Sequence, residues 1–177
     1  MRHPETFSAV YALSAYGLAF TDSVERGYDK NWRAAMTLTD WQQFAKAGFI
    51  TNLLLAFGAA NAPDAGNPPF FEDLPYIASG DSLMLDQRIA RRWSARPIEM
   101  VPEYAVNLRK LAISFDAGTQ DGFKDIPIRA AELDRLMTDL RIPHAFELYP
   151  GGHGDHIRAR MESKVLPFFS RELQAAR

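Results

Sequence analysis

Apolar residues in this chain occur either in short continuous runs or at helical spacing, and the two patterns alternate in the second half. Short runs with β-branched and aromatic members predict three buried strands: Ser8–Ala15, Leu111–Phe115 and His144–Tyr149. Between the last two, apolar positions recur at helical spacing over Ile128–Leu140, which predicts a helix. A closing helix is expected over Ile157–Leu173, bent near Pro167. Strand, helix, strand, helix in this order predicts right-handed βαβ units on a parallel sheet, and hence the α/β class.

The middle of the chain has a different pattern. Residues Gly17–Asn31 are polar and rich in turn formers, which predicts a loop. The Thr-x-x-Gln spacing of Thr39–Gln42 has the shape of a capping box in front of an apolar stretch, Phe44–Ala60. We therefore expect a helix or a pair of helices here, interrupted near Gly48. The proline-rich segment Asn61–Pro75 is expected to be an ordered loop.

Two further helices are expected before the second strand. The first spans Ser82–Trp93, with Asp81 or Ser82 as its N-cap. The second begins at Pro102, because proline is favoured in the first turn of a helix, and ends near Arg109.

Composition narrows the function classes. The 177 residues are 47% hydrophobic and 12% aromatic, which suits one folded domain. A net charge of −2 provides no basic surface for nucleic acid, and the absence of cysteine excludes disulfides and a thiolate nucleophile. No apolar run approaches the roughly 20 residues needed to span a bilayer, so no membrane partner is expected. The run Val10–Phe20 is interpreted as a strand and not as a secretion signal, which favours the cytoplasm.

Reactive residue types are concentrated in the two loops that follow the second and third predicted strands. These loops are Asp116–Asp121 and Pro150–His156. In parallel sheets, catalytic groups gather where strands end at their carboxyl edge, and strands joined by one crossover helix are close neighbours. An Asp of the first loop is therefore expected to reach a His of the second. Such a pair is the supporting half of a hydrolase triad, in which Asp or Glu precedes His in the chain.

Three segments carry a resemblance to a known family. Residues Met1–Ser14 (MRHPETFSAVYALS), Phe115–Asp121 (FDAGTQD) and Tyr149–His153 (YPGGH) resemble the branch of the α/β-hydrolases that includes S-formylglutathione hydrolase, feruloyl esterases and enterochelin esterases. The resemblance covers both ends of the chain, Met1–Ser14 and Leu111–Phe169. It implies an α/β-hydrolase-like three-layer sandwich, of which this chain is the C-terminal part, within a single partial domain. The middle of the chain, about residues 17–93, resembles the family's lid insertion.

The resemblance also implies roles for individual residues. Asp121 matches the triad acid and His153 the general base, with Asp116 as second choice for the acid. The implied activity is hydrolysis of a small carboxylic ester by a serine hydrolase, which needs no cofactor. The chain's aromatic and methionine side chains are expected either to line an acyl or aromatic pocket or to form the core of the lid: Trp41, Phe44, Phe49, Phe57, Phe70, Phe71, Met84 and Trp93.

The nucleophile is where this chain departs from the family. The Gly-x-Ser-x-Gly elbow that should come about one helix before Met1–Ser14 occurs nowhere in the 177 residues. Two serines are weaker alternatives: Ser82, within the block Gly80–Leu83, and Ser14, at the end of the first strand. The alternative function is therefore a catalytically silent half-domain that acts as an association or binding partner.

Three more expectations concern metal binding, the other histidines and association. The cluster His153–His156 contains two His and one Asp, yet adjacent loop residues need a third ligand from elsewhere to hold a metal ion, so no metal is expected. His144 and His3 are expected to be structural. An unpaired first strand would expose backbone N–H and C=O groups, so we expect a homodimer or a complementing N-terminal fragment.

Overall fold

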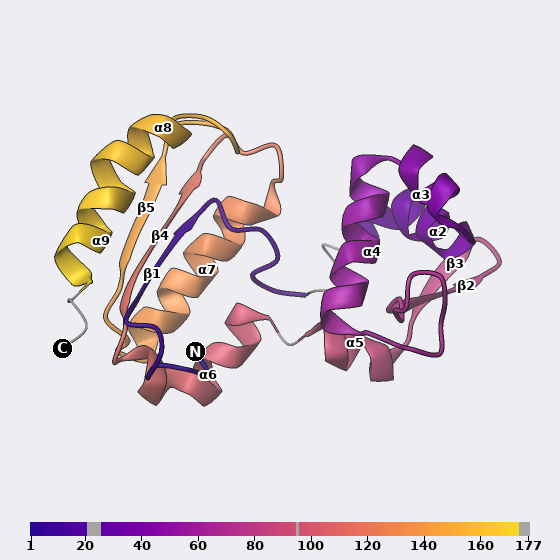
Figure 1. Cartoon of the computed structure of the whole chain (residues 1–177), viewed down its shortest axis with the longest axis horizontal. Helices are drawn as coiled ribbons and strands as arrows, with labels where there is room; N and C mark the ends of the chain where they lie inside the picture. The colour runs from indigo at the N-terminus through magenta and orange to yellow at the C-terminus, as the bar shows by residue number, and fades with distance from the viewer. Residues whose placement is uncertain (21–25, 95, 174–177) are drawn as a thin grey trace. The chain divides into compact units, whose positions relative to one another are not determined.

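The computed structural model describes residues 1–20, 26–94 and 96–173. The chain divides into two compact units, one formed by Met1–Ala19 and Pro97–Arg177 and the other by Phe20–Arg96 (Figure 1). The second unit is inserted between the first strand of the first unit and the rest of that unit.

The first unit contains three strands and the helices that pack on them. Its elements are β1 (Ala9–Leu13), α6 (Pro97–Leu108), β4 (Ala112–Gly118), α7 (Asp125–Asp139), β5 (Ala145–Tyr149), α8 (Ile157–Arg160), the π-helical turn η2 (Met161–Val165) and α9 (Leu166–Glu172). The strands form one parallel sheet in the order β1-β4-β5, with Leu13 beside Asp116 and Gly118 beside Tyr149. The sequence prediction of three strands in a parallel sheet is confirmed. The chain is a mixed α/β protein, and this arrangement is compatible with an α/β-hydrolase-like fold.

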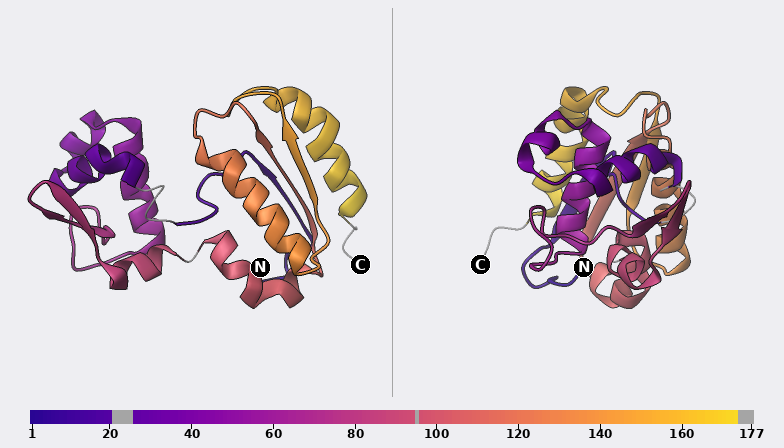
Figure 2. Two further views of the ribbon diagram at one scale, coloured as in Figure 1. Left: turned by 180° about the vertical axis from the view of Figure 1, so that it is seen from behind. Right: turned by 90° about the vertical axis from the view of Figure 1, so that its right-hand side faces the viewer.

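Helices cover both faces of this sheet. Figures 1 and 2 show α7 and α9 on opposite sides of the three strands. On the α7 face, Phe115 and Ala117 of β4 are buried in a core with Val101 of α6 and Leu133 of α7. On the other face, the Tyr11 ring packs edge-on against Phe168 of α9. The alternation of side chains along β4 therefore separates an apolar face from a face that carries Ser114 and Asp116.

The second unit has its own core. Its elements are η1 (Arg26–Tyr28), α2 (Asp29–Thr37), α3 (Trp41–Lys46), α4 (Phe49–Asn61), the antiparallel strands β2 (Tyr76–Ser79) and β3 (Ser82–Leu85), and α5 (Gln87–Trp93). Trp32 packs its ring against Tyr76 at 5.1 Å and against Trp93 at 5.4 Å. The predicted helix break near Gly48 is confirmed, since α3 ends at Lys46 and α4 begins at Phe49.

The prediction of a helix over Ser82–Trp93 is wrong in its first third. Ser82 lies in β3, paired with Ser79 across a turn that contains Gly80 at φ +55°. The helix begins only at Gln87, capped by Asp86, whose side chain accepts hydrogen bonds from two backbone N–H groups. Pairing with β2 supplies the backbone partners that a helix would otherwise provide, and the sequence alone did not reveal that strand.

Two other predicted boundaries and the course of the closing helix also differ from the structure. Helix α6 begins at Pro97, so Pro102 lies inside it, because Pro97 already occupies the favoured first position. The predicted loop Gly17–Asn31 ends early, since α2 begins at Asp29; its residues 21–25 lie outside the described part of the chain. The closing helix deviates through the π-helical turn η2, which comes just before Pro167, a residue without a backbone N–H. In the described ranges, no helix is both long and apolar enough to span a membrane.

Candidate functional site

The loop after β4 holds a buried carboxylate. β4 ends at Gly118, and the backbone N–H of Asp121 donates to the Gly118 carbonyl at 3.2 Å, which closes a tight turn. The Asp121 side chain has no exposed surface. Its Oδ1 accepts a hydrogen bond from the backbone N–H of Phe123 at 2.9 Å. One carboxylate oxygen is therefore satisfied within the loop, and the other is left to face a partner.

The loop after β5 is bound to the loop after β4 through its backbone. Thr119 N–H donates to the Tyr149 carbonyl at 2.9 Å, and Gln120 N–H donates to the Gly151 carbonyl at 2.8 Å. The backbones come so close that a Cβ on Gly118 would overlap the Gly151 carbonyl oxygen. Glycine is therefore required at position 118, because any side chain there would push the two loops apart.

These bonds bring His153 to Asp121. The Nδ1 of His153 lies 3.0 Å from Oδ2 of Asp121, and the His153 side chain is 46% exposed. Nε2 of His153 has no hydrogen-bond partner in the part of the chain that the structure describes. When Nδ1 donates its proton to a buried carboxylate, Nε2 is left to accept a proton from another group. This is how an Asp orients a His that acts as a general base.

Asp116, the second-choice acid, is bonded elsewhere. Its Oδ2 accepts from the Tyr11 hydroxyl at 2.8 Å and from Arg160 Nε and Nη2 at 3.0 and 2.7 Å. Burial, followed by the hydrogen bond to Asp116, raises the pKa of Tyr11 to about 12, so Tyr11 remains a neutral donor. Burial lowers the pKa of Arg160, but hydrogen bonds to Glu147 and Asp116 outweigh it and raise that pKa overall. The structure thus pairs His153 with Asp121 and assigns Asp116 to a buried ion pair.

Arg160 also supports the His153 loop. Its guanidinium lies 4.0 Å from the centroid of the Tyr149 ring, and its backbone N–H donates to the His156 carbonyl at 2.8 Å. Nη2 reaches Glu147 at 3.0 Å. One buried cation therefore contacts both ends of the loop that carries His153.

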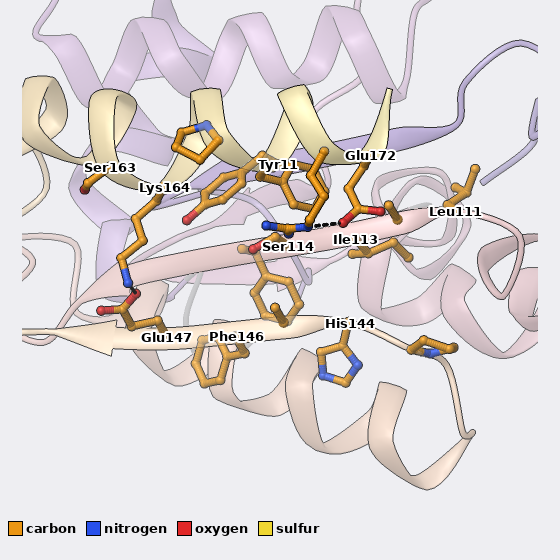
Figure 3. Close-up of a pocket in the computed structure, with 17 residues that line it drawn as sticks. Tyr11, Leu111, Ile113, Ser114, His144, Phe146, Glu147, Ser163, Lys164 and Glu172 are labelled. Carbon is orange, nitrogen blue, oxygen red and sulfur yellow. Dashed lines mark hydrogen bonds and ion pairs between the residues drawn. The ribbon is translucent and has the colours of Figure 1, made fainter. Parts of the chain in front are cut away.

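A cavity of about 440 Å³ lies between the sheet and the C-terminal helical segment (Figure 3). The charged lining groups Lys164 and Glu147, and Arg171 and Glu172, are paired with each other. Lys164 reaches Glu147 at 2.9 Å, and hydrogen bonds from Arg160 and Lys164 lower the pKa of Glu147. His153 and Asp121 are not among its lining residues. A second cavity, of about 320 Å³, is mostly apolar and is lined by residues of β1, β4, α6 and α7.

Neither alternative serine bonds to His153. Ser14 follows β1 with a left-handed φ of +41°, and its backbone N–H donates to the Asp116 carbonyl at 2.9 Å. The Ser14 hydroxyl is buried and has no hydrogen-bond partner among the described residues. Ser82 is exposed in the β2–β3 hairpin of the second unit.

The remaining histidines make local contacts. His144 lies 3.0 Å from Asp134 through Nε2 and stacks on Phe115, while His3 lies 3.1 Å from Glu5. Across the described ranges, no three His, Cys, Asp or Glu side chains are grouped to hold a metal ion.

The aromatic candidates for a pocket are divided between core and surface. Trp93 belongs to the core of the second unit, and Phe57 packs against that core. Trp41, Phe44 and Phe70 pack their rings on one another. The remaining three are exposed: Phe49, Phe71 and Met84.

Sequence reasoning missed three residues that shape the site: Gly118, Phe123 and Arg160. Gly118 had a signal, since it lies in a Gly-containing loop directly after a strand. Phe123 and Arg160 had none, because both read as ordinary parts of a loop and a helix.

Fold and site together define an α/β protein in which a buried Asp and a half-exposed His are paired where two neighbouring parallel strands end. No protein-family model matches the chain, and no curated protein matches it. Among solved structures, the chain is similar to a ferulic acid esterase, with 18% identity and a TM-score of 0.47. The alignment covers 97% of this chain and 44% of that structure, so the chain spans less than half of that protein's length. Similarity at this level establishes neither activity nor substrate.

Proposed function

We propose that this chain is a carboxylic-ester hydrolase of the serine-hydrolase type, or the portion of one that carries the acid and the base. The observation that supports this proposal is the 3.0 Å contact between His153 Nδ1 and a fully buried Asp121, with Nε2 unpartnered among the described residues. His153 would accept the proton of a serine hydroxyl and return it to the leaving alcohol. Asp121 would fix the tautomer and stabilise the imidazolium.

In this proposal, the serine approaches His153 from Nε2, since Nδ1 is committed to Asp121. Ser14 and Ser82 are the serines of this chain to consider first, and a serine from another polypeptide is the alternative. The substrate class is a small ester or thioester; short acyl, aromatic and S-formyl groups are all compatible with this pair. The chemistry proceeds without a cofactor.

A fluorophosphonate probe tests this function, because it labels a serine only when a base and an oxyanion site activate it. We expect a single adduct by intact-mass spectrometry and its loss in His153→Ala. His156→Ala is the matched control, because His156 lies in the same loop and has no carboxylate partner in the described structure. Equal labelling in wild type and His153→Ala would refute the role of His153. No label on the folded chain would mean that it holds no activated serine, which is the result expected if the serine comes from another polypeptide or if the chain is a silent association module.

A second candidate function is that of a silent association module, and the edge of β1 favours it. In a parallel ladder, residues alternate in the direction of their backbone groups. Ser8 and Ser14 bond to β4, so the N–H and C=O groups of Ala9, Tyr11 and Leu13 point away from it. This edge borders the 320 Å³ apolar cavity. The partner would be a second copy of the chain or a separate fragment, and a monodisperse monomer at micromolar concentration in sedimentation would exclude the second copy.

A further inference from the structure

Phe123 contacts both members of the Asp–His pair directly. Its backbone N–H donates to Asp121 Oδ1 at 2.9 Å. Its ring lies edge-on to the His153 imidazole, with centroids 5.1 Å apart and planes 71° apart. The same ring also meets Tyr16, with centroids 5.5 Å apart and planes 61° apart. The Phe123 ring therefore contacts two aromatic side chains, His153 and Tyr16.

The two contacts restrict the rotation of two different side chains, Asp121 and His153. The backbone hydrogen bond fixes the rotation of the Asp121 carboxylate, because it holds Oδ1 and so presents Oδ2 to His153. The His153 side chain is 46% exposed and has one hydrogen bond, so without further contacts its ring could rotate into solvent. An edge-to-face aromatic contact opposes that rotation. A contact of this type shifts a two-state equilibrium by roughly threefold to tenfold.

We propose that Phe123 is a positioning residue for His153, holding the imidazole in the orientation that faces Asp121. The Phe123 ring is itself in contact with Tyr16. The consequence for catalysis rests on the proposed function, whereas the positioning itself concerns only the contacts in this chain. The two are therefore tested by different measurements.

The test uses the full chain labelled with ¹⁵N-histidine, and it measures the exchange of the His153 Nδ1 proton with water by NMR. Substitution by Ala, Leu or Tyr keeps the backbone N–H at position 123, so the hydrogen bond to Asp121 stays while the ring contact with His153 changes. We expect the exchange to be threefold to tenfold faster in Phe123→Ala, with a smaller increase in Phe123→Leu. Phe123→Tyr restores an aromatic edge and should return the rate to that of wild type.

Phe146→Ala is the matched control. Phe146 is also half-buried and packs its ring on Phe115 at 5.0 Å, without contact to His153. Its loss should lower the stability of the first unit without changing the exchange at His153. An unchanged rate in Phe123→Ala, or an equal increase in Phe146→Ala, would overturn the proposal. If Phe123→Ala fails to fold, comparison of Phe123→Leu with Phe123→Tyr decides in the same way.

Fluorophosphonate labelling separates this inference from the proposed function. Faster exchange in a chain that takes no label supports the positioning role while the esterase proposal fails. A chain that takes the label, but whose exchange is unchanged in Phe123→Ala, supports the esterase proposal while the positioning role fails.

Discussion

Glu72, in the second unit, is buried and forms no ion pair among the described residues. Its side chain is 3% exposed, and neither carboxylate oxygen has a hydrogen-bond partner among the described residues. The carboxylate lies against Gly58 of α4 so closely that a Cβ there would overlap it. Burial is the main cause that raises the pKa of Glu72 to about 8, and the charge of Asp73 adds to it. The folded unit therefore holds Glu72 as a neutral acid at pH 7.

This burial makes the stability of the second unit depend on pH in a defined direction. The unfolded chain releases the Glu72 proton near the ordinary pKa of 4.5, whereas the folded chain retains it up to about 8. Stability is therefore full below pH 4.5 and falls as the pH rises, by about 1.4 kcal/mol per pH unit, until it levels off above pH 8. The whole interval corresponds to about 5 kcal/mol, a large part of the free energy of unfolding of a small domain.

Glu72→Gln removes the ionisation while keeping the shape of the side chain. We expect its free energy of unfolding to equal that of wild type near pH 4 and to exceed it by several kcal/mol at pH 8.5. All three tryptophans of the chain lie in the second unit, at positions 32, 41 and 93, so tryptophan fluorescence in urea follows this unit alone. Asp81→Asn is the control, because it removes an exposed carboxylate from the hairpin turn of the same unit. The same pH dependence in wild type and Glu72→Gln, between pH 5 and pH 8, would refute the reasoning.

Three further substitutions test the packing. Gly118→Ala should lower stability by about 1–3 kcal/mol and speed the exchange of the His153 Nδ1 proton, because the new methyl group displaces the Gly151 carbonyl. Arg160→Met should lower stability by about 3–5 kcal/mol in urea denaturation followed by circular dichroism, since it leaves the buried Asp116 charge without its cation. Asp86→Ala should lower it by about 1 kcal/mol in tryptophan fluorescence, because it removes the cap of α5.

Each of these outcomes has a contrary result that would count against it. If Gly118→Ala were as stable as wild type, the two loops could move apart without a cost in free energy, which would contradict the first prediction. Arg160→Met together with Asp116→Asn should recover part of the lost stability, and no recovery would contradict the ion-pair account. An Asp86→Asn variant keeps a capping oxygen and should lie close to wild type.

The strands of the first unit could be predicted because each is a buried apolar run, a pattern that depends on local sequence alone. β4 and β5 occur where Leu111–Phe115 and His144–Tyr149 predicted them. The β2–β3 hairpin could not be predicted in this way. Its strands are short and largely exposed, so their pairing depends on Tyr76 and Leu83 reaching a core that is built by distant helices.

The site shows the same division. Strand order and loop composition were enough to nominate an Asp of the loop 116–121 and a His of the loop 150–156, because parallel strands end at one edge of their sheet. The choice of Asp121 and His153 came from the family resemblance, which left Asp116 as the second choice for the acid in the same six-residue segment. The tertiary structure separates them: side chains alternate along β4, so Asp116 faces Arg160, while Asp121 follows the turn and faces His153.

By itself, the sequence determined the residue types of the site, the α/β class and the order of the strands and helices in the first unit, because these follow from composition and periodicity. Only the tertiary structure decided which carboxylate is paired with His153, that Gly118 must lack a side chain, and that Phe123 contacts both members of the pair. Each of these depends on distances between segments that are remote in the chain. Periodicity specifies which face of an element is buried, but it does not specify which atoms from another element meet that face.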